Sequence, residues 1–411
     1  MMRLVPTAAR PISLGLVLAA LAGTLALGVA IKTPCASGNW GDGRQYERLC
    51  YSDIVPLLGT EQLGGGRLPY LEPCDRAVGG ECDEYPVLSM WAMRAAAGVS
   101  GHDVRRFFFA NVVILALAAS VVVVAVALMA GRRALWVALA PTMLLYGFMN
   151  WDLLAVACAT AATLAYRRRR DVWAGALLGL GAAAKIYPAL LIVPFVVGRF
   201  RAKEPERGTY LTWAAIASWL AVNVPFALAS PSSWWEFFRF NAKRPADWDS
   251  IWFIACHRAT GEYTCGHTGL INVASLVLFV ALTALLWRWK ASRDPGFARW
   301  TLGFPILVLF LLSNKVYSPQ YGLWLLPWFA LALPQLRLFI AFEIADVLVF
   351  VTRFSWFGEY AGFGGLPIGA FEVAVAVRTV VLIACLAAWV RHRDPAPSPV
   401  EIAPGMVVAT A

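Results

Sequence analysis

Charged residues are scarce in this chain of 411 residues: Asp, Glu, Lys and Arg together make up 15%, while hydrophobic residues make up 60%. This balance excludes an ordinary water-soluble domain, in which about a quarter of the residues are charged. Strand patterns of alternating apolar and polar residues are also missing, which favours helices. Gly-rich phosphate loops, His-based zinc motifs and nucleophile elbows are absent as well. We therefore expect any chemistry to come from side chains in loops and at helix ends.

The chain contains instead a succession of apolar stretches of roughly 15 to 25 residues, and a helix needs about 20 such residues to cross a bilayer. These stretches predict an all-α, polytopic membrane bundle of about twelve transmembrane helices, folded as one domain over residues 1–390. Residues 85–94 predict a further helix that either lies in the interface or crosses the membrane. The expected crossings are 12–31, 106–130, 134–149, 152–166, 172–185, 187–199, 209–229, 269–289, 301–312, 321–335, 338–351 and 367–390.

Basic residues indicate how the bundle is oriented. The formal net charge is +10, but the cations form short clusters that are separated by pairs of apolar stretches. This spacing follows the positive-inside rule, so we place the clusters in the cytoplasm, beside anionic lipids, and expect no nucleic acid partner. The interpretation is a multi-pass plasma-membrane protein with both termini in the cytoplasm. The clusters lie at 132–133, 167–170, 199–203, 288–293 and 391–393.

The two chain ends carry further expectations. Arg3 and Arg10 precede the first apolar run, which is longer than the core of a signal peptide, so we expect an uncleaved anchor. Residues 391–411 are rich in proline and polar side chains and are expected to form a disordered cytoplasmic tail.

Cysteine placement tests the orientation independently, because disulfides persist outside the cytoplasm. Two long polar loops, 32–105 and 230–268, fall on the predicted outer side, and the first is long enough to be a catalytic loop. Its four cysteines allow three pairings, and the sequence leaves these open, whereas the second loop holds one simple pair. The disulfide candidates are Cys35, Cys50, Cys74, Cys82, Cys256 and Cys265.

Polar residues gather at the outer ends of the predicted helices, and ionisable groups at membrane depth cost roughly 2.5 to 3.5 kcal/mol on insertion scales. Asp53 is our candidate catalytic base because it stands where the polar loop ends and an apolar segment begins. The alternative for Asp53 is a solvated helix cap. Within the helices, the charges left to explain are Glu343, Asp346, Glu372 and Arg378.

Lys185 and Lys315 are candidate phosphate ligands, since each ammonium group adjoins apolar runs at the outer surface. The alternative is that each lysine merely snorkels to the interface. Asp152 also has an alternative explanation as a helix cap. The remaining candidate substrate-binding residues are Glu84, Tyr85, Asn150, Asp152, Tyr187, Asn314, Tyr317, Gln320, Tyr321 and Arg353.

The second outer loop has two features with competing explanations. His257 and His267 flank the cysteine pair, so a zinc site is the alternative to a disulfide there. The aromatic run 234–238 is typical of an interfacial belt, and the alternative is a wall for sugar rings or a polyprenyl chain.

Several motifs recur in an order that resembles a known family. They are the outer-loop aspartate, Pro69-Tyr70, Glu84-Tyr85-Pro86, GAAAKIYP at 181–188, Asn223-Val-Pro-Phe226 and SNKVYSPQY at 313–321. At these motifs the chain resembles the actinobacterial polyprenol-phosphate-mannose-dependent mannosyltransferases of glycosyltransferase family 87, within the GT-C superfamily.

The resemblance implies a GT-C bundle whose active site lies between the first outer loop and the membrane surface, with Asp53 as the base. It implies transfer of a sugar, usually mannose, from a polyprenyl-phosphate carrier with inversion and without a metal cofactor. The expected acceptor is an extracytoplasmic glycolipid or cell-envelope glycan. Alternatives from the sequence alone are a lipid-linked sugar flippase or another transporter, and a non-catalytic assembly partner; acceptor, linkage and oligomeric state stay open.

Overall fold

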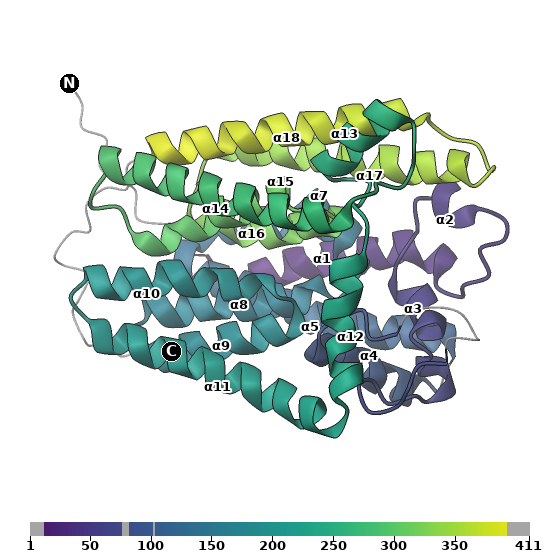
Figure 1. Ribbon diagram of the computed structural model, residues 1–411, viewed down its shortest axis with the longest axis horizontal. Helices are drawn as coiled ribbons and strands as arrows, with labels where there is room; N and C mark the ends of the chain where they lie inside the picture. Colours follow the sequence, from purple (N-terminus) through teal and green to yellow (C-terminus); the bar gives the residue numbers. More distant parts are fainter. Residues whose placement is uncertain (1–11, 76–81, 102, 393–411) are drawn as a thin grey trace.

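The computed structural model describes residues 12–75, 82–101 and 103–392. In these ranges the regular secondary structure consists of eighteen α-helices and six short 3-10 helices, without strands, which confirms the predicted all-α polytopic bundle. The long helices lie side by side along the long axis of the molecule (Figure 1). The expectations for Arg3 and Arg10 and for most of the tail expected at 391–411 concern positions outside the described residues. Arg391, the first residue of that expected tail, is instead the last residue of a helix.

Each of the twelve expected crossings corresponds to a helical region. Five regions are long and apolar enough to span a membrane by length and composition alone: Leu14–Cys35, Val104–Ala138, Pro205–Ala229, Thr268–Arg293 and Ile368–Arg391. Shorter or interrupted helices pack between them. The main helices of the bundle, long and short, are α1 (Leu14–Lys32), α5 (Val104–Ala130), α8 (Asp152–Arg167), α9 (Asp171–Ala184), α10 (Ile192–Arg201), α11 (Pro205–Ala229), α14 (Thr268–Arg293), α15 (Gly303–Ser313), α16 (Gly322–Leu331), α17 (Leu336–Tyr360) and α18 (Ile368–Arg391).

Three sequence-based boundaries were wrong. The stretch 134–149 is not one helix: α6 (Ala134–Ala138) ends and α7 (Pro141–Tyr146) begins at Pro141, because proline starts a helix readily but cannot continue one. Helix α17 runs nine residues beyond its expected end at 351, so Arg353 is a helical residue. The second loop contains α12 (Pro231–Lys243) and α13 (Ile251–Thr260), whose polar residues hid the helical pattern.

Small residues allow the closest helix packing in the bundle. Gly175 and Gly179 of α9 face α11, and a Cβ atom at Gly175 would lie 2.0 Å from the carbonyl oxygen of Leu211. One at Gly179 would lie 2.2 Å from the carbonyl oxygen of Ala215. Such contact between backbones is typical of membrane helices, which gain van der Waals packing from small residues at their interfaces.

The outer surface of the bundle is apolar, as contact with lipid requires. Large aliphatic side chains such as Leu117, Leu228, Leu270 and Val380 are exposed on α5, α11, α14 and α18. Since soluble monomers rarely expose patches of this kind, these faces indicate a multi-pass membrane protein.

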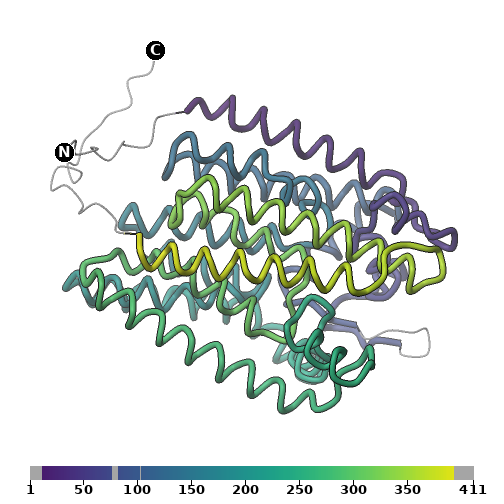
Figure 2. Tube along the Cα trace, turned by 90° about the horizontal axis from the view of Figure 1, so that it is seen from above, coloured from purple at the N-terminus to yellow at the C-terminus, as the bar shows by residue number. Residues whose placement is uncertain are grey.

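The two ends of the bundle differ in character. Helix α1 begins and α18 ends at the same end of the bundle (Figure 2). The connection from α8 to α9, which contains Arg167–Arg170, lies at this end as well, and we name it the arginine end. At the opposite end, which we name the loop end, lie α2 (Arg44–Glu47), α3 (Ile54–Thr60) and α4 (Val87–Ser100). Helix α12 runs across the bundle near them (Figure 1). At 14 residues, α4 is too short to cross a bilayer unaided. Its position in the membrane interface stays a prediction.

Candidate active site

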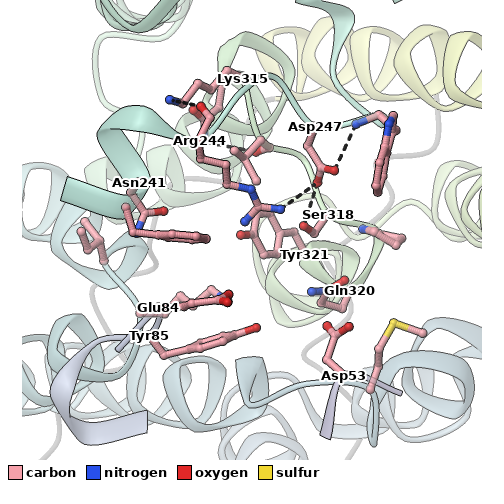
Figure 3. A pocket seen from close by; sticks show the side chains of 18 of the residues that line it. Asp53, Glu84, Tyr85, Asn241, Arg244, Asp247, Lys315, Ser318, Gln320 and Tyr321 are labelled. Atoms are coloured by element: carbon pink, nitrogen blue, oxygen red, sulfur yellow. Dashed lines mark hydrogen bonds and ion pairs between the residues drawn. The ribbon is translucent and has the colours of Figure 1, made fainter. Parts of the chain in front are cut away.

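A cavity of about 850 Å³ lies at the loop end of the bundle, where the segments around α3, the ends of α9 and α12, the α15–α16 connection and α17 meet (Figure 3). Ten of the thirteen predicted site residues line it: Asp53, Glu84, Tyr85, Lys185, Tyr187, Asn314, Lys315, Gln320, Tyr321 and Arg353. Asn150 and Asp152 do not line it but contact Asp53 and Lys185, which do. Tyr317 does not line it either, and its ring stacks with Arg378. The roles of these residues stay predictions.

Asp53 points into the cavity from the start of α3 (Figure 3). One of its carboxylate oxygens accepts a hydrogen bond of 2.9 Å from the side-chain amide of Asn150. The hydroxyl of Tyr51 also interacts with this carboxylate. Among the described cations, none forms an ion pair with Asp53, although Lys32, Lys185 and Arg353 are close enough for their charges to act on it.

The segment that carries Asp53 is fixed by contacts on both sides. The Cys35–Cys50 disulfide ties it to the end of α1, and the ammonium group of Lys32 donates to the carbonyl oxygen of Tyr51 at 2.5 Å. The Ser52 hydroxyl donates to the carbonyl oxygen of Phe148 at 2.8 Å. These contacts hold the loop against the connection between α7 and α8, which positions Asp53 beside Asn150.

Lys185 extends from the C-terminal end of α9 between two tyrosine rings, with 5.0 Å from its ammonium nitrogen to the ring centroids of Tyr85 and Tyr321. The same nitrogen lies 3.4 Å from the carboxylate of Asp152, which is fully buried and also accepts from the indole of Trp324 at 2.7 Å. Asp152 is therefore more than a helix cap, because it balances the charge of a lysine at the cavity wall.

A buried carboxylate in the first loop holds the segment that carries Glu84 and Tyr85 beside the cavity. The side chain of Glu61 accepts hydrogen bonds from the backbone N–H groups of Asp83, at 2.7 Å, and Glu84, at 3.1 Å. Arg67 pairs with Asp83 at 2.9 Å beneath them. Burial, followed by the negative charge of Glu84, raises the pKa of Glu61 to about 8.

Arg244 and Asp247, which the sequence analysis did not single out, line the cavity from the connection between α12 and α13. Their side chains are 3.6 Å apart, and Asp247 also accepts from the Ser318 hydroxyl at 2.9 Å. Burial opposes ionisation of Asp247, but the charges of Arg244 and Arg353 hold its pKa below the ordinary value. In the sequence, only the mixture of charged and aromatic residues in RPADWD (244–249) could have marked Arg244 and Asp247 as site residues, and the same mixture is common in solvated loops.

Lys315 lines the cavity, but its ammonium group is bonded to this connection. Its ammonium group donates to the carbonyl oxygens of Ala242, at 3.3 Å, and Arg244, at 2.6 Å. Burial and the nearby charge of Arg244 lower the pKa of Lys315 to about 8. These hydrogen bonds position the backbone of Arg244, and the role of Lys315 as a phosphate ligand stays a prediction.

The four charges that the sequence left unexplained within α17 and α18 all have partners. The guanidinium of Arg378 lies 3.3 Å from Asp346 and 3.5 Å from Asp249, and it stacks on Tyr317 with 3.8 Å to the ring centroid. Arg353 forms an ion pair with Asp249 as well. This buried network attaches the α12–α13 connection to the bundle. The other two charges are also engaged: Glu343 accepts from the backbone of Thr142 at 2.8 Å, and Glu372 pairs with Arg258.

Three disulfides are present, and all six predicted cysteines take part. The first loop contains Cys35–Cys50 and Cys74–Cys82, and the second contains Cys256–Cys265. The pair in the second loop leaves His257 and His267 without the thiolate partners that a zinc site would need. In the part of the chain that the structure describes, no cluster of three or more His, Cys, Asp or Glu side chains has the arrangement of a metal site.

A second, apolar cavity of about 470 Å³ adjoins the first and shares with it Pro86, Ile186 and Phe237. Its walls come from α9, the start of α10, α11 and α12. They include Ala182, Ile192, Ile216, Leu220 and Phe238. Because the aromatic run of α12 faces this space, it forms part of a cavity wall as well as an interfacial belt.

Comparison with known proteins identifies the family. The profile of glycosyltransferase family 87 matches residues 85–313, more than half of the chain, from Tyr85 at the cavity to the end of α15. No curated protein matches the chain. The flippase and assembly-partner alternatives have no comparable support. Of the four helix charges left to explain, Asp346, Glu372 and Arg378 are ion-paired and Glu343 accepts a backbone hydrogen bond. The match over most of a polytopic bundle with a polar cavity at one end shows that this chain belongs to glycosyltransferase family 87 and is a membrane glycosyltransferase.

Proposed function

We propose that this protein transfers mannose, with inversion, from a polyprenyl-phosphate carrier to a glycolipid or cell-envelope glycan on the extracytoplasmic side of the plasma membrane. The observation that carries the proposal is the junction of two unlike cavities. One is polar, with Asp53 and several cations on its walls, and the other is apolar and opens among membrane helices. A lipid phosphate has these two parts, an apolar chain and an anionic head that carries the sugar.

Asp53 acts as the general base in this proposal. Its carboxylate takes the proton of the acceptor hydroxyl as the oxygen attacks the anomeric carbon, and the bond from that carbon to the phosphate oxygen breaks. The proton ends on Asp53, and polyprenyl phosphate leaves with the electron pair of the broken bond. A positioned carboxylate base contributes about 10² to 10⁴-fold to such a rate.

The extracytoplasmic location rests on the contrast between the two ends of the bundle. The three disulfides lie in loops of the cavity end, and disulfides persist outside the cytoplasm. Arg167–Arg170 lie at the opposite end, as the positive-inside rule expects for cytoplasmic connections.

Sugar transfer by the purified protein in lipid nanodiscs tests this proposal. The assay supplies radiolabelled polyprenyl-phosphate mannose with a membrane extract as the source of acceptor, and GDP-mannose serves as a control donor that lacks a lipid chain. We expect label to enter a new glycoconjugate from the lipid donor alone. Transfer from GDP-mannose would contradict the donor assignment. Absence of transfer from any polyprenyl-phosphate sugar, with accelerated movement of the carrier across vesicle membranes, would overturn the transferase proposal in favour of a flippase.

A further inference from the structure

Four cationic side chains line the polar cavity, and three of them are already engaged. Lys185 pairs with Asp152, Lys315 donates to two backbone carbonyl groups, and Arg353 pairs with Asp249. The fourth is Arg244, whose side chain projects into the cavity toward Tyr321 (Figure 3). A guanidinium group has five N–H donors, and among the described residues the one ion-pair partner of Arg244 is Asp247, at 3.6 Å.

The leaving group determines what this cavity has to supply. A sugar linked to polyprenyl phosphate is a phosphodiester with one negative charge, and departure of the sugar leaves a phosphate monoester with a charge of about −1.5 to −2 at pH 7. A cation that is already in position stabilises this developing charge in the transition state. A guanidinium group suits the task because two of its N–H groups match two phosphate oxygens.

Arg244 and Asp53 approach the cavity from opposite walls (Figure 3). Inversion requires the base and the departing phosphate on opposite faces of the anomeric carbon, so a sugar between these two side chains has the required arrangement. Arg244 also stands close enough to Glu84 for the charge of that carboxylate to affect it. Tyr85 lies near the shared wall with the apolar cavity, since its neighbour Pro86 lines both.

We propose that Arg244 binds the phosphate of the lipid-linked donor and stabilises it as the sugar departs; this inference rests on the proposed function. Asp247 then acts as a positioning residue, because it orients the guanidinium from one side. Lys315 fixes the carbonyl oxygen of Arg244 from behind. The buried Arg353–Asp249–Arg378 network attaches the same connection to α17 and α18.

The test separates phosphate recognition from catalysis. Two ligands are offered to the protein in nanodiscs, polyprenyl phosphate and the matching polyprenol without phosphate, and binding is measured together with mannose transfer from polyprenyl-phosphate mannose. The variants are Arg244→Gln, Arg244→Lys and, as a matched control, Arg239→Gln. Arg239 belongs to α12, pairs with Glu236 and does not line the cavity.

Wild-type protein is expected to prefer polyprenyl phosphate over polyprenol, and Arg244→Gln to lose this preference while kcat falls by about 10² to 10³-fold. Arg244→Lys should retain part of both, because it keeps the charge but loses the two-pronged geometry. Arg239→Gln should match the wild type. Arg244→Gln and Arg244→Lys variants that fold, transfer and discriminate like the wild type would overturn the role of Arg244 alone. Wild-type protein that neither transfers nor prefers the phosphate would overturn the proposed function and this inference with it.

Discussion

The side-chain amide nitrogen of Asn150 donates to the carboxylate of Asp53 at 2.9 Å and to the hydroxyl of Tyr85 at 2.7 Å. Asn150 is buried behind the cavity wall, and its side-chain oxygen accepts from the backbone of Trp151 at 2.6 Å, which fixes the direction in which the amide points. A single amide therefore holds together two cavity residues that belong to separate parts of the first loop. This relationship predicts that Asn150 sets the position of the base.

Replacement of Asn150 with alanine is expected to lower kcat by about 10²-fold, because displacement of a catalytic group by 1 Å has an effect of that size. The donor KM should change little, since Asn150 does not line the cavity. Steady-state kinetics with varied donor concentration measure both constants. A variant in which KM rises while kcat stays unchanged would show that Asn150 supports donor binding rather than the base.

The ion pair of Lys185 with Asp152 predicts that replacing only one of the two residues destabilises the protein, because it leaves one buried charge without a partner. Asp152→Ala leaves a mostly buried ammonium group without its partner, which typically costs about 3–5 kcal/mol and should lower the melting temperature clearly. The double variant Asp152→Ala with Lys185→Met removes both charges and should recover much of that stability but not transfer activity. Thermal unfolding followed by tryptophan fluorescence measures the effect. Equal melting temperatures for Asp152→Ala and the wild type would contradict the assignment.

Glu61 predicts a dependence of stability on pH. Its pKa is raised from 4.5 to about 8 in the folded protein, so between these values the folded state binds more protons than the unfolded state. The free energy of unfolding should therefore fall as pH rises from about 5 to 8, and Glu61→Gln should remove this part of the slope. Melting temperatures at pH 6 and pH 8.5 provide the comparison. A wild-type slope identical to that of Glu61→Gln would rule out this titration.

The fold was largely predictable because membrane helices are recognisable in sequence as long apolar runs. The positions of arginines and cysteines added an orientation that stays a prediction. Asp53, Lys185 and Arg353, which line the cavity, could be selected as candidates for a related reason: an isolated charge beside an apolar run is conspicuous. Helix α12 was missed since its surface contacts are aromatic and polar rather than aliphatic, so it resembled a loop in sequence.

The rest of the site depended on contacts between distant segments. Arg244 and Asp247 stand in a loop where charge is expected, and only the fold reveals that they face Asp53. Arg378 and Asp346 were left unexplained in sequence, because 32 positions of chain separate these two side chains, which form an ion pair in the fold. Pairing of this kind leaves no local pattern, so charge within a helix could not be assigned to structure or function beforehand.

The most direct test of the account is the rate of mannose transfer from polyprenyl-phosphate mannose by Asp53→Asn, measured beside Asp42→Asn, a change of the same kind in the exposed part of the first loop. Binding of polyprenyl phosphate and the melting temperature serve as controls for the site and the fold. The account predicts that Asp53→Asn binds the carrier and melts like the wild type, yet loses transfer by at least about 10²-fold, the lower range for a general base, while Asp42→Asn stays active. Wild-type transfer by Asp53→Asn would contradict the central claim that this carboxylate is the catalytic base.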